Sequence, residues 1–122
     1  MALATPKRMH GASPAHARSR VQERETAKRI GGKVTKGSGS GDERGDVRLR
    51  GFVRVENKTT KHRSFSVTDE LISKLEGAVF GAGEVPVLQI ELALGARKVL
   101  VLPDWALDMI VEALQADKGD TR

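Results

Sequence analysis

The chain contains no cysteine, so disulfide bonds and thiolate-bound zinc sites are both excluded. Phe, Trp and Tyr together make up only 3% of the residues, which leaves few aromatic rings on which single-stranded bases could stack. No apolar run approaches the length of a membrane span, and the first twenty residues lack the continuous apolar stretch of a secretory signal. We therefore expect a soluble, cytoplasmic protein that does not act at a membrane.

The length of 122 residues suits one compact domain and is too short for two of ordinary size. With 39% hydrophobic and 30% charged residues, the composition predicts a modest core under a heavily charged surface. We expect a flexible basic N-terminal tail over residues 1–18, a single domain over residues 19–116 and a C-terminal tail over residues 117–122.

Positive charge is concentrated in the first half of the chain. Residues 1–63 hold sixteen Lys and Arg against six Asp and Glu, an excess of ten positive charges, whereas residues 64–122 hold five against ten. Cations that displace the counterions condensed on a duplex gain affinity with little dependence on base sequence. The first half therefore favours contact with double-stranded nucleic acid, although charge alone also suits acidic proteins and membranes.

Apolar periodicity and turn signals predict eight elements in the order α-β-β-β-α-β-β-α. We expect a helix over 19–30, strands over 33–35, 46–49 and 53–59, a helix from 68 to 79, strands over 86–92 and 98–102, and a helix from 103 or 104. This order implies an α/β fold with a mixed sheet flanked by helices. In the strand over 86–92, Gln89 and Glu91 alternate with inward-facing Leu88 and Ile90, which predicts that they are exposed or border a site.

The segment from Asp46 to residue 59 is expected to form a β-hairpin whose register follows from its apolar residues. A two-residue turn at 50–51 would direct Asp46 and Glu56 to opposite faces of the sheet. A three-residue connection over 50–52 instead pairs Asp46 with Glu56. It places the apolar side chains on one face and the charged ones on the other, in the sets Val47, Leu49, Val53, Val55 and Asp46, Arg48, Arg54, Glu56, Lys58. We therefore predict the second register.

Two carboxylates directly opposite each other repel unless a cation compensates them, and hard carboxylate oxygens suit Mg²⁺, with Mn²⁺ as a substitute. Lys58 follows Glu56 by two residues, which places it on the same face about 6–7 Å further along the strand. There it could orient or deprotonate an attacking water. The alternative is a solvated hairpin face, which is common for an acid-x-Lys triplet alone; the paired Asp46 and the basic surroundings favour the metal site.

Several motifs follow one another in a recognisable order between residues 21 and 95. They are Glu23-Arg24-Glu25 in a helix, Gly31-Gly32, the GSGSG loop, Asp46, Glu56-Asn57-Lys58-Thr59-Thr60, a helix and Pro86-Val87-Leu88. This order resembles the PD-(D/E)xK core of the restriction-endonuclease-like nucleases, and within that superfamily it is similar to archaeal and phage Holliday-junction resolvases. The chain departs from the pattern at the position before Asp46, which is not Pro, at Asn57, and over residues 96–122, which match nothing.

The resemblance implies a restriction-endonuclease-like fold and a homodimeric, Mg²⁺-dependent endonuclease that resolves four-way DNA junctions in a bacterial or phage-infected cell, without a nucleotide cofactor. It implies that Asp46 and Glu56 bind the metal, that Glu23 completes the metal site with Glu25 as its alternative, and that Lys58 is catalytic. The expected DNA contacts are Lys33, Lys36, Ser38, Ser40, Arg44, Arg48, Thr59, Lys61 and Arg63. Two alternatives stay open, namely a nuclease of the same superfamily that acts on flaps, nicks or mismatches, and a non-catalytic basic DNA-binding protein.

Overall fold

A computed structural model describes residues 13–35 and 46–120 of the chain. The elements are α1 (Pro14–Ile30), β1 (Lys33–Val34), β2 (Asp46–Leu49), β3 (Val53–Thr59), α2 (Asp69–Ala78), β4 (Val85–Leu92), the 3₁₀ turn η3 (Ala93–Gly95), β5 (Arg97–Val101) and α3 (Ala106–Asp120). Apart from η3, this is the predicted order. The α/β fold, with a mixed sheet flanked by helices, is confirmed.

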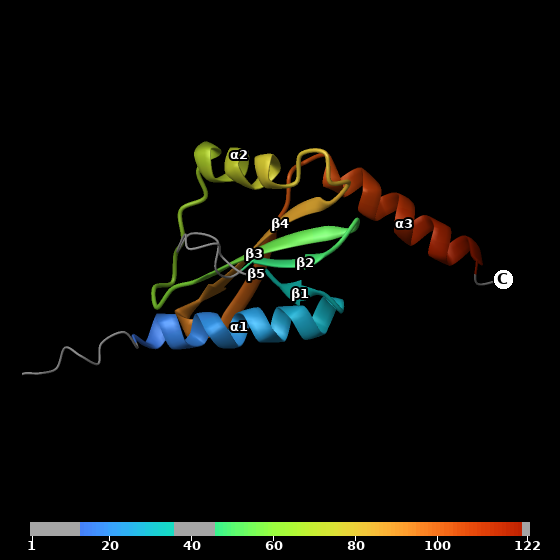
Figure 1. The fold of residues 1–122 in the computed structure, drawn as a ribbon. Coiled ribbons are helices and arrows are strands. Elements are labelled where there is room, and N and C mark those ends of the chain that lie inside the picture. Colours follow the sequence, from blue (N-terminus) through green and yellow to red (C-terminus); the bar gives the residue numbers. More distant parts are fainter. Residues whose placement is uncertain (1–12, 36–45, 121–122) are drawn as a thin grey trace, which may run out of the picture.

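The five strands form one sheet in the order β1-β2-β3-β4-β5, in which only β3 and β4 are parallel. Helix α1 covers one face of the sheet, and α2 lies on the opposite side (Figure 1). Val47, Val55 and Val87 pack under α1 together with Ala27 and Ile30 of that helix. A second cluster, on the other face, joins Leu75 of α2 to Leu88 and Ile90 of β4, with Leu71 and Ile72 packed against it. The sheet therefore has an apolar cluster on each face.

Helix α1 begins at Pro14, five residues earlier than predicted. The side chain of Ser13 accepts a hydrogen bond from the backbone N–H of His16, and proline suits the first helical position because its nitrogen has no proton to leave unsatisfied. The prediction of a flexible tail over 1–18 is therefore wrong for the described residues from Ser13 onward, and residues 1–12 lie outside the described part of the chain.

The hairpin register is confirmed. Leu49 pairs with Val53, Val47 with Val55, and Asp46 with Glu56. The turn is closed by the N–H of Phe52, which donates to the carbonyl of Leu49 at 2.9 Å, and Gly51 supplies a φ of +81°. Glycine adopts this left-handed conformation without the steric cost that a side chain would add.

The turn is also fixed to the segment before β4 by Glu84, whose side chain is only 1% exposed. Arg48 donates to Glu84 through Nη2 at 2.7 Å and through Nε, and the N–H of Gly51 donates to the same carboxylate at 3.0 Å. The hydrogen bond from Arg48 lowers the pKa of Glu84, which burial by itself would raise. The ionised pair thus links β2 to the entrance of β4.

Helix α3 projects away from the sheet (Figure 1) and leaves large apolar side chains exposed, among them Leu107, Ile110, Val111 and Leu114. It continues to Asp120, so the predicted tail over 117–122 is wrong for residues 117–120. None of the helices in residues 13–35 and 46–120 is both long and apolar enough to cross a membrane.

Candidate active site

The hairpin directs two carboxylates and two cations to the sheet face that α2 covers. Asp46 lies on β2, and Glu56 lies opposite it on β3. Both side chains line one small cavity together with Arg54 and with Leu75 of α2. Its volume of about 10 Å³ is close to the minimum that admits one water molecule. The two acids are therefore on the same side of the sheet.

Each carboxylate has a cation beside it. Arg54 donates to Oδ2 of Asp46 through Nη2 at 2.8 Å and through Nε at 3.2 Å. Nζ of Lys58 lies 3.0 Å from Oε2 of Glu56. The residues Asp46 and Glu56 are only 6% and 9% exposed, whereas the side chain of Lys58 is 37% exposed. The acids are thus held in a partly dry setting in which charge interactions are stronger than in water, and the lysine reaches solvent.

The two carboxylates are the type of donor that Mg²⁺ prefers, although the cavity between them and α2 has room for only about one water molecule. This ion binds hard oxygens and is usually held by one or two carboxylates, with waters and substrate phosphate completing its coordination. Asp46 and Glu56 are two such carboxylates on neighbouring strands and on one face. Within residues 13–35 and 46–120, no group of three or more His, Cys, Asp or Glu side chains could hold a metal ion. The described residues therefore bring two carboxylates together and do not form the predicted three-acid site.

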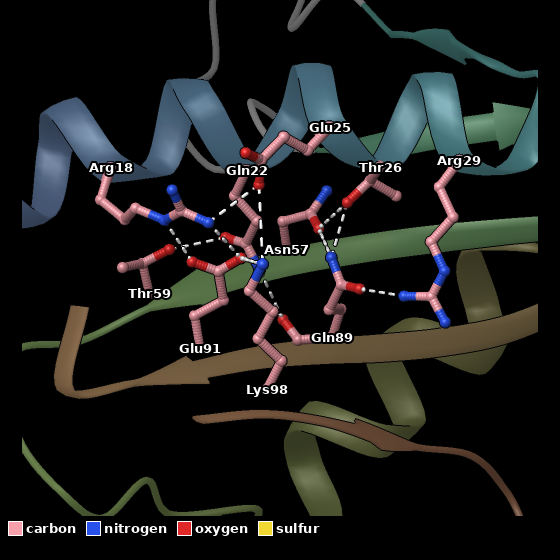
Figure 2. Close-up of polar contacts among 10 residues, drawn as sticks. All are labelled: Arg18, Gln22, Glu25, Thr26, Arg29, Asn57, Thr59, Gln89, Glu91 and Lys98. Carbon is pink, nitrogen blue, oxygen red and sulfur yellow. Dashed lines mark hydrogen bonds and ion pairs between the residues drawn. The ribbon is translucent and has the colours of Figure 1, made fainter. Parts of the chain in front are cut away.

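Glu23 is not brought to the Asp46–Glu56 pair. It lies on α1, which packs on the other face of the sheet, where its neighbours Gln22 and Thr26 bond to β3 and β4 (Figure 2). Its predicted alternative, Glu25, is also elsewhere, because it pairs with Arg18 at 2.9 Å and faces Lys98 at 3.7 Å. A helix residue on that face is separated from the two carboxylates by the sheet itself.

A buried polar network lies between α1 and the sheet, and sequence reasoning missed it (Figure 2). The side-chain amide of Gln89 donates to the Thr26 hydroxyl at 2.6 Å and to Oδ1 of Asn57 at 2.8 Å. Gln22, which is fully buried, donates to the carbonyl of Gln89 and accepts from the Thr59 hydroxyl at 2.6 Å. The prediction that Gln89 and Glu91 are exposed is wrong, because β4 is an interior strand covered by helices on both faces.

The predicted DNA contacts differ in their surroundings. Lys33, Lys61 and Arg63 are exposed. The guanidinium of Arg48 is bound to Glu84, and the hydroxyl of Thr59 is bound to Gln22, so both groups have structural partners. The remaining predicted contacts lie outside the described residues, and they are Lys36, Ser38, Ser40 and Arg44.

Comparison of the chain with known protein families, with curated proteins and with solved structures finds no match.

Proposed function

We propose that the chain is a Mg²⁺-dependent endonuclease that hydrolyses phosphodiesters in four-way DNA junctions. The observation that carries the proposal is the pairing of Asp46 with Glu56 on one sheet face, with Nζ of Lys58 3.0 Å from the Glu56 carboxylate. Two close, buried carboxylates and an exposed ammonium group are the parts that metal-assisted phosphodiester hydrolysis needs.

Asp46 and Glu56 would hold the metal, which when bound polarises the scissile phosphate and a water. Arg54 donates two hydrogen bonds to one oxygen of Asp46 and so fixes the orientation of that carboxylate. Lys58 combines contact with Glu56 and exposure to solvent, so its ammonium group can reach an incoming phosphate. There it stabilises the negative charge that develops on the phosphate oxygens in the transition state.

The cleavage test compares three labelled DNAs of equal length, a four-way junction, a flap and a linear duplex, with and without Mg²⁺. We expect cutting that requires Mg²⁺ or Mn²⁺. We also expect the junction to be cut at least about tenfold faster than the linear duplex, because a tenfold rate ratio requires a difference of only about 1.4 kcal/mol in activation free energy. Faster cutting of the flap would assign the enzyme to the alternative substrate class. Salt-sensitive binding without product at any metal concentration would leave a non-catalytic DNA-binding protein.

We also propose that the protein acts as a homodimer, because symmetric resolution of a junction needs two incisions in opposed strands. The surface of β5 and α3 suits a second copy. Of the thirteen exposed large hydrophobic residues in the described chain, eight lie between Val99 and Leu114. The stripe Leu107, Ile110, Val111 and Leu114 is symmetric about its centre, so it is self-complementary when two copies of α3 cross antiparallel.

Replacing Ile110 and Leu114 with Glu is expected to convert a dimer into a monomer of 13.2 kDa, because two charges would be buried against apolar side chains. Light scattering coupled to size exclusion measures the mass, and circular dichroism checks the fold. The matched control, Ala116→Glu with Gly119→Glu, adds the same charges on the side of α3 away from the stripe and should stay dimeric. A wild-type mass of one chain at every concentration would rule out the dimer.

A further inference from the structure

The outer face of α1 carries a line of cations that the candidate active site does not use. Arg20, Arg24 and Lys28 follow one another at intervals of four residues and are all exposed. Residues at this spacing lie on one side of a helix, about 6 Å apart along its axis. Among residues 13–35 and 46–120 none of the three forms an ion pair, and Glu25, the acid next to Arg24, pairs instead with Arg18 and Lys98. We call Arg20, Arg24 and Lys28 the α1 ridge.

Repulsion within the ridge costs the helix stability, and only Lys28, in the last turn, gains from the helix dipole. Like charges at i and i+4 destabilise a helix by roughly 0.2–0.5 kcal/mol per pair, and the ridge contains two such pairs. A helix surface that served only solubility would gain from alternating signs at these positions. The side of α1 that stabilises the fold is the other one, where Gln22 and Thr26 are buried against the sheet.

The chemistry of the ridge favours a phosphodiester backbone over a lipid surface. Membrane-binding helices combine cations with a large exposed apolar face. No residue of α1 is among the exposed large hydrophobic residues of the described chain. A line of cations about 12 Å long instead matches three to four phosphates of one strand, at about 3.4 Å of helix axis per phosphate.

The position of the ridge decides which DNA it can reach. The Asp46–Glu56 cavity opens under α2, whereas α1 lies on the opposite side of the sheet (Figure 1). The ridge lies on the side of α1 that faces away from the sheet, and a helix is about 10–12 Å thick. A straight duplex held at the cavity therefore runs on the other side of the domain from the ridge.

We propose that the α1 ridge binds the phosphate backbone of a second DNA segment while the first lies at the Asp46–Glu56 site. This inference rests on the proposed function and names the feature of the substrate that the protein recognises, which is two duplex segments presented to opposite faces of one domain. A branched DNA meets that condition, and a single straight duplex does not.

The test measures binding by fluorescence anisotropy for a four-way junction and a linear duplex of equal length, over a range of salt concentrations. EDTA is present throughout, so that binding is measured without cleavage. The ridge variant is Arg24→Gln with Lys28→Gln. Its control, Arg50→Gln with Lys74→Gln, removes one Arg and one Lys at exposed positions away from the ridge. We expect the salt slope for the junction to fall by about 2 in the ridge variant, since each lost phosphate contact removes about 0.9. Affinity for the linear duplex should change no more than in the control.

Equal losses in the ridge variant and the control would overturn the proposal, as would equal losses for the junction and the linear duplex. Loss of binding to anionic phospholipid vesicles without loss of junction binding would assign the ridge to membranes and also overturn it. If wild-type protein cuts the junction but the ridge variant binds it like the control, the DNA-binding role of the ridge is refuted and the proposed nuclease activity is retained. If wild-type protein never cuts but the ridge variant loses affinity for the junction alone, the nuclease activity is refuted and the DNA-binding role of the ridge is retained.

Discussion

Replacing Asp46 with Asn is expected to reduce Mg²⁺-dependent cleavage of a four-way junction by about 10³-fold or more. The change removes the negative charge from one of two carboxylates in the cavity while keeping its shape. Metal polarisation is worth several kcal/mol of transition-state stabilisation, and a loss of about 4 kcal/mol corresponds to about 10³ in rate. Single-turnover cleavage, with enzyme in excess over labelled junction, measures the chemical step directly.

Two further measurements make the result specific. Junction binding in EDTA should change by less than about threefold, because the 6% exposed Asp46 contributes little surface to the DNA. Calorimetric titration with Mn²⁺ should show weaker metal binding, which is a readout independent of cutting. The control Asp69→Asn removes a carboxylate from the exposed first turn of α2 and should retain activity. An Asp46→Asn protein that cuts like wild type would refute the metal-binding role.

Replacing Arg18 with Met is expected to lower the free energy of unfolding by about 3 kcal/mol, the range seen when one partner of a buried ion pair is removed. Nε of Arg18 donates to Oε1 of Glu91 at 2.6 Å, Nη2 donates to Oε2 at 3.0 Å, and the side chain of Glu91 is 1% exposed (Figure 2). The hydrogen bond to Glu91 raises the pKa of Arg18, so the charged form persists at any working pH. Without Arg18, the cation nearest to Glu91 within the described residues is Lys98, whose Nζ lies 3.9 Å from Oε2.

Urea denaturation followed by circular dichroism measures the loss. The control Arg20→Met, on the same helix but exposed, should shift stability by no more than about 0.5 kcal/mol. A double variant that also changes Glu91 to Gln should recover part of the loss, because the uncompensated buried charge is then removed. If the Arg18 and Arg20 variants unfold at the same urea concentration, the pair does not hold α1 to β4.

The hairpin was predictable because its register is determined by residues that lie close together in the sequence. Alternation of apolar and charged residues over 46–59 allows one register that separates the two sets, and Asp46 opposite Glu56 follows from it. Lys58 beside Glu56 follows in turn from the two-residue period of a strand. These relations need no knowledge of the rest of the chain.

The predictions that failed depended on packing between distant segments. Gln89 and Glu91 are polar residues in a strand covered on both faces, and their burial is possible only because Thr26 and Arg18 of α1 supply partners. The place of Glu23 depends on which face of the sheet α1 covers, which periodicity does not reveal. The start of α1 is a different case. The Ser13-Pro14 capping signal is present in the sequence, but the first turns of the helix contain few apolar residues, so apolar periodicity did not indicate a helix there.

The parallel contact between β3 and β4 has a consequence for the order in which the chain folds. Val53 pairs with Val85, 32 residues away, whereas Leu49 pairs with Val53 across a three-residue turn. Because closing a longer loop costs more entropy, the 46–59 hairpin is expected to assemble before β4 docks. Arg54 and Lys58, the counter-charges of Asp46 and Glu56, belong to that same hairpin. The hairpin therefore contains the cations that offset the repulsion between its two acids. Asp46 and Glu56 can come together before the rest of the domain has folded.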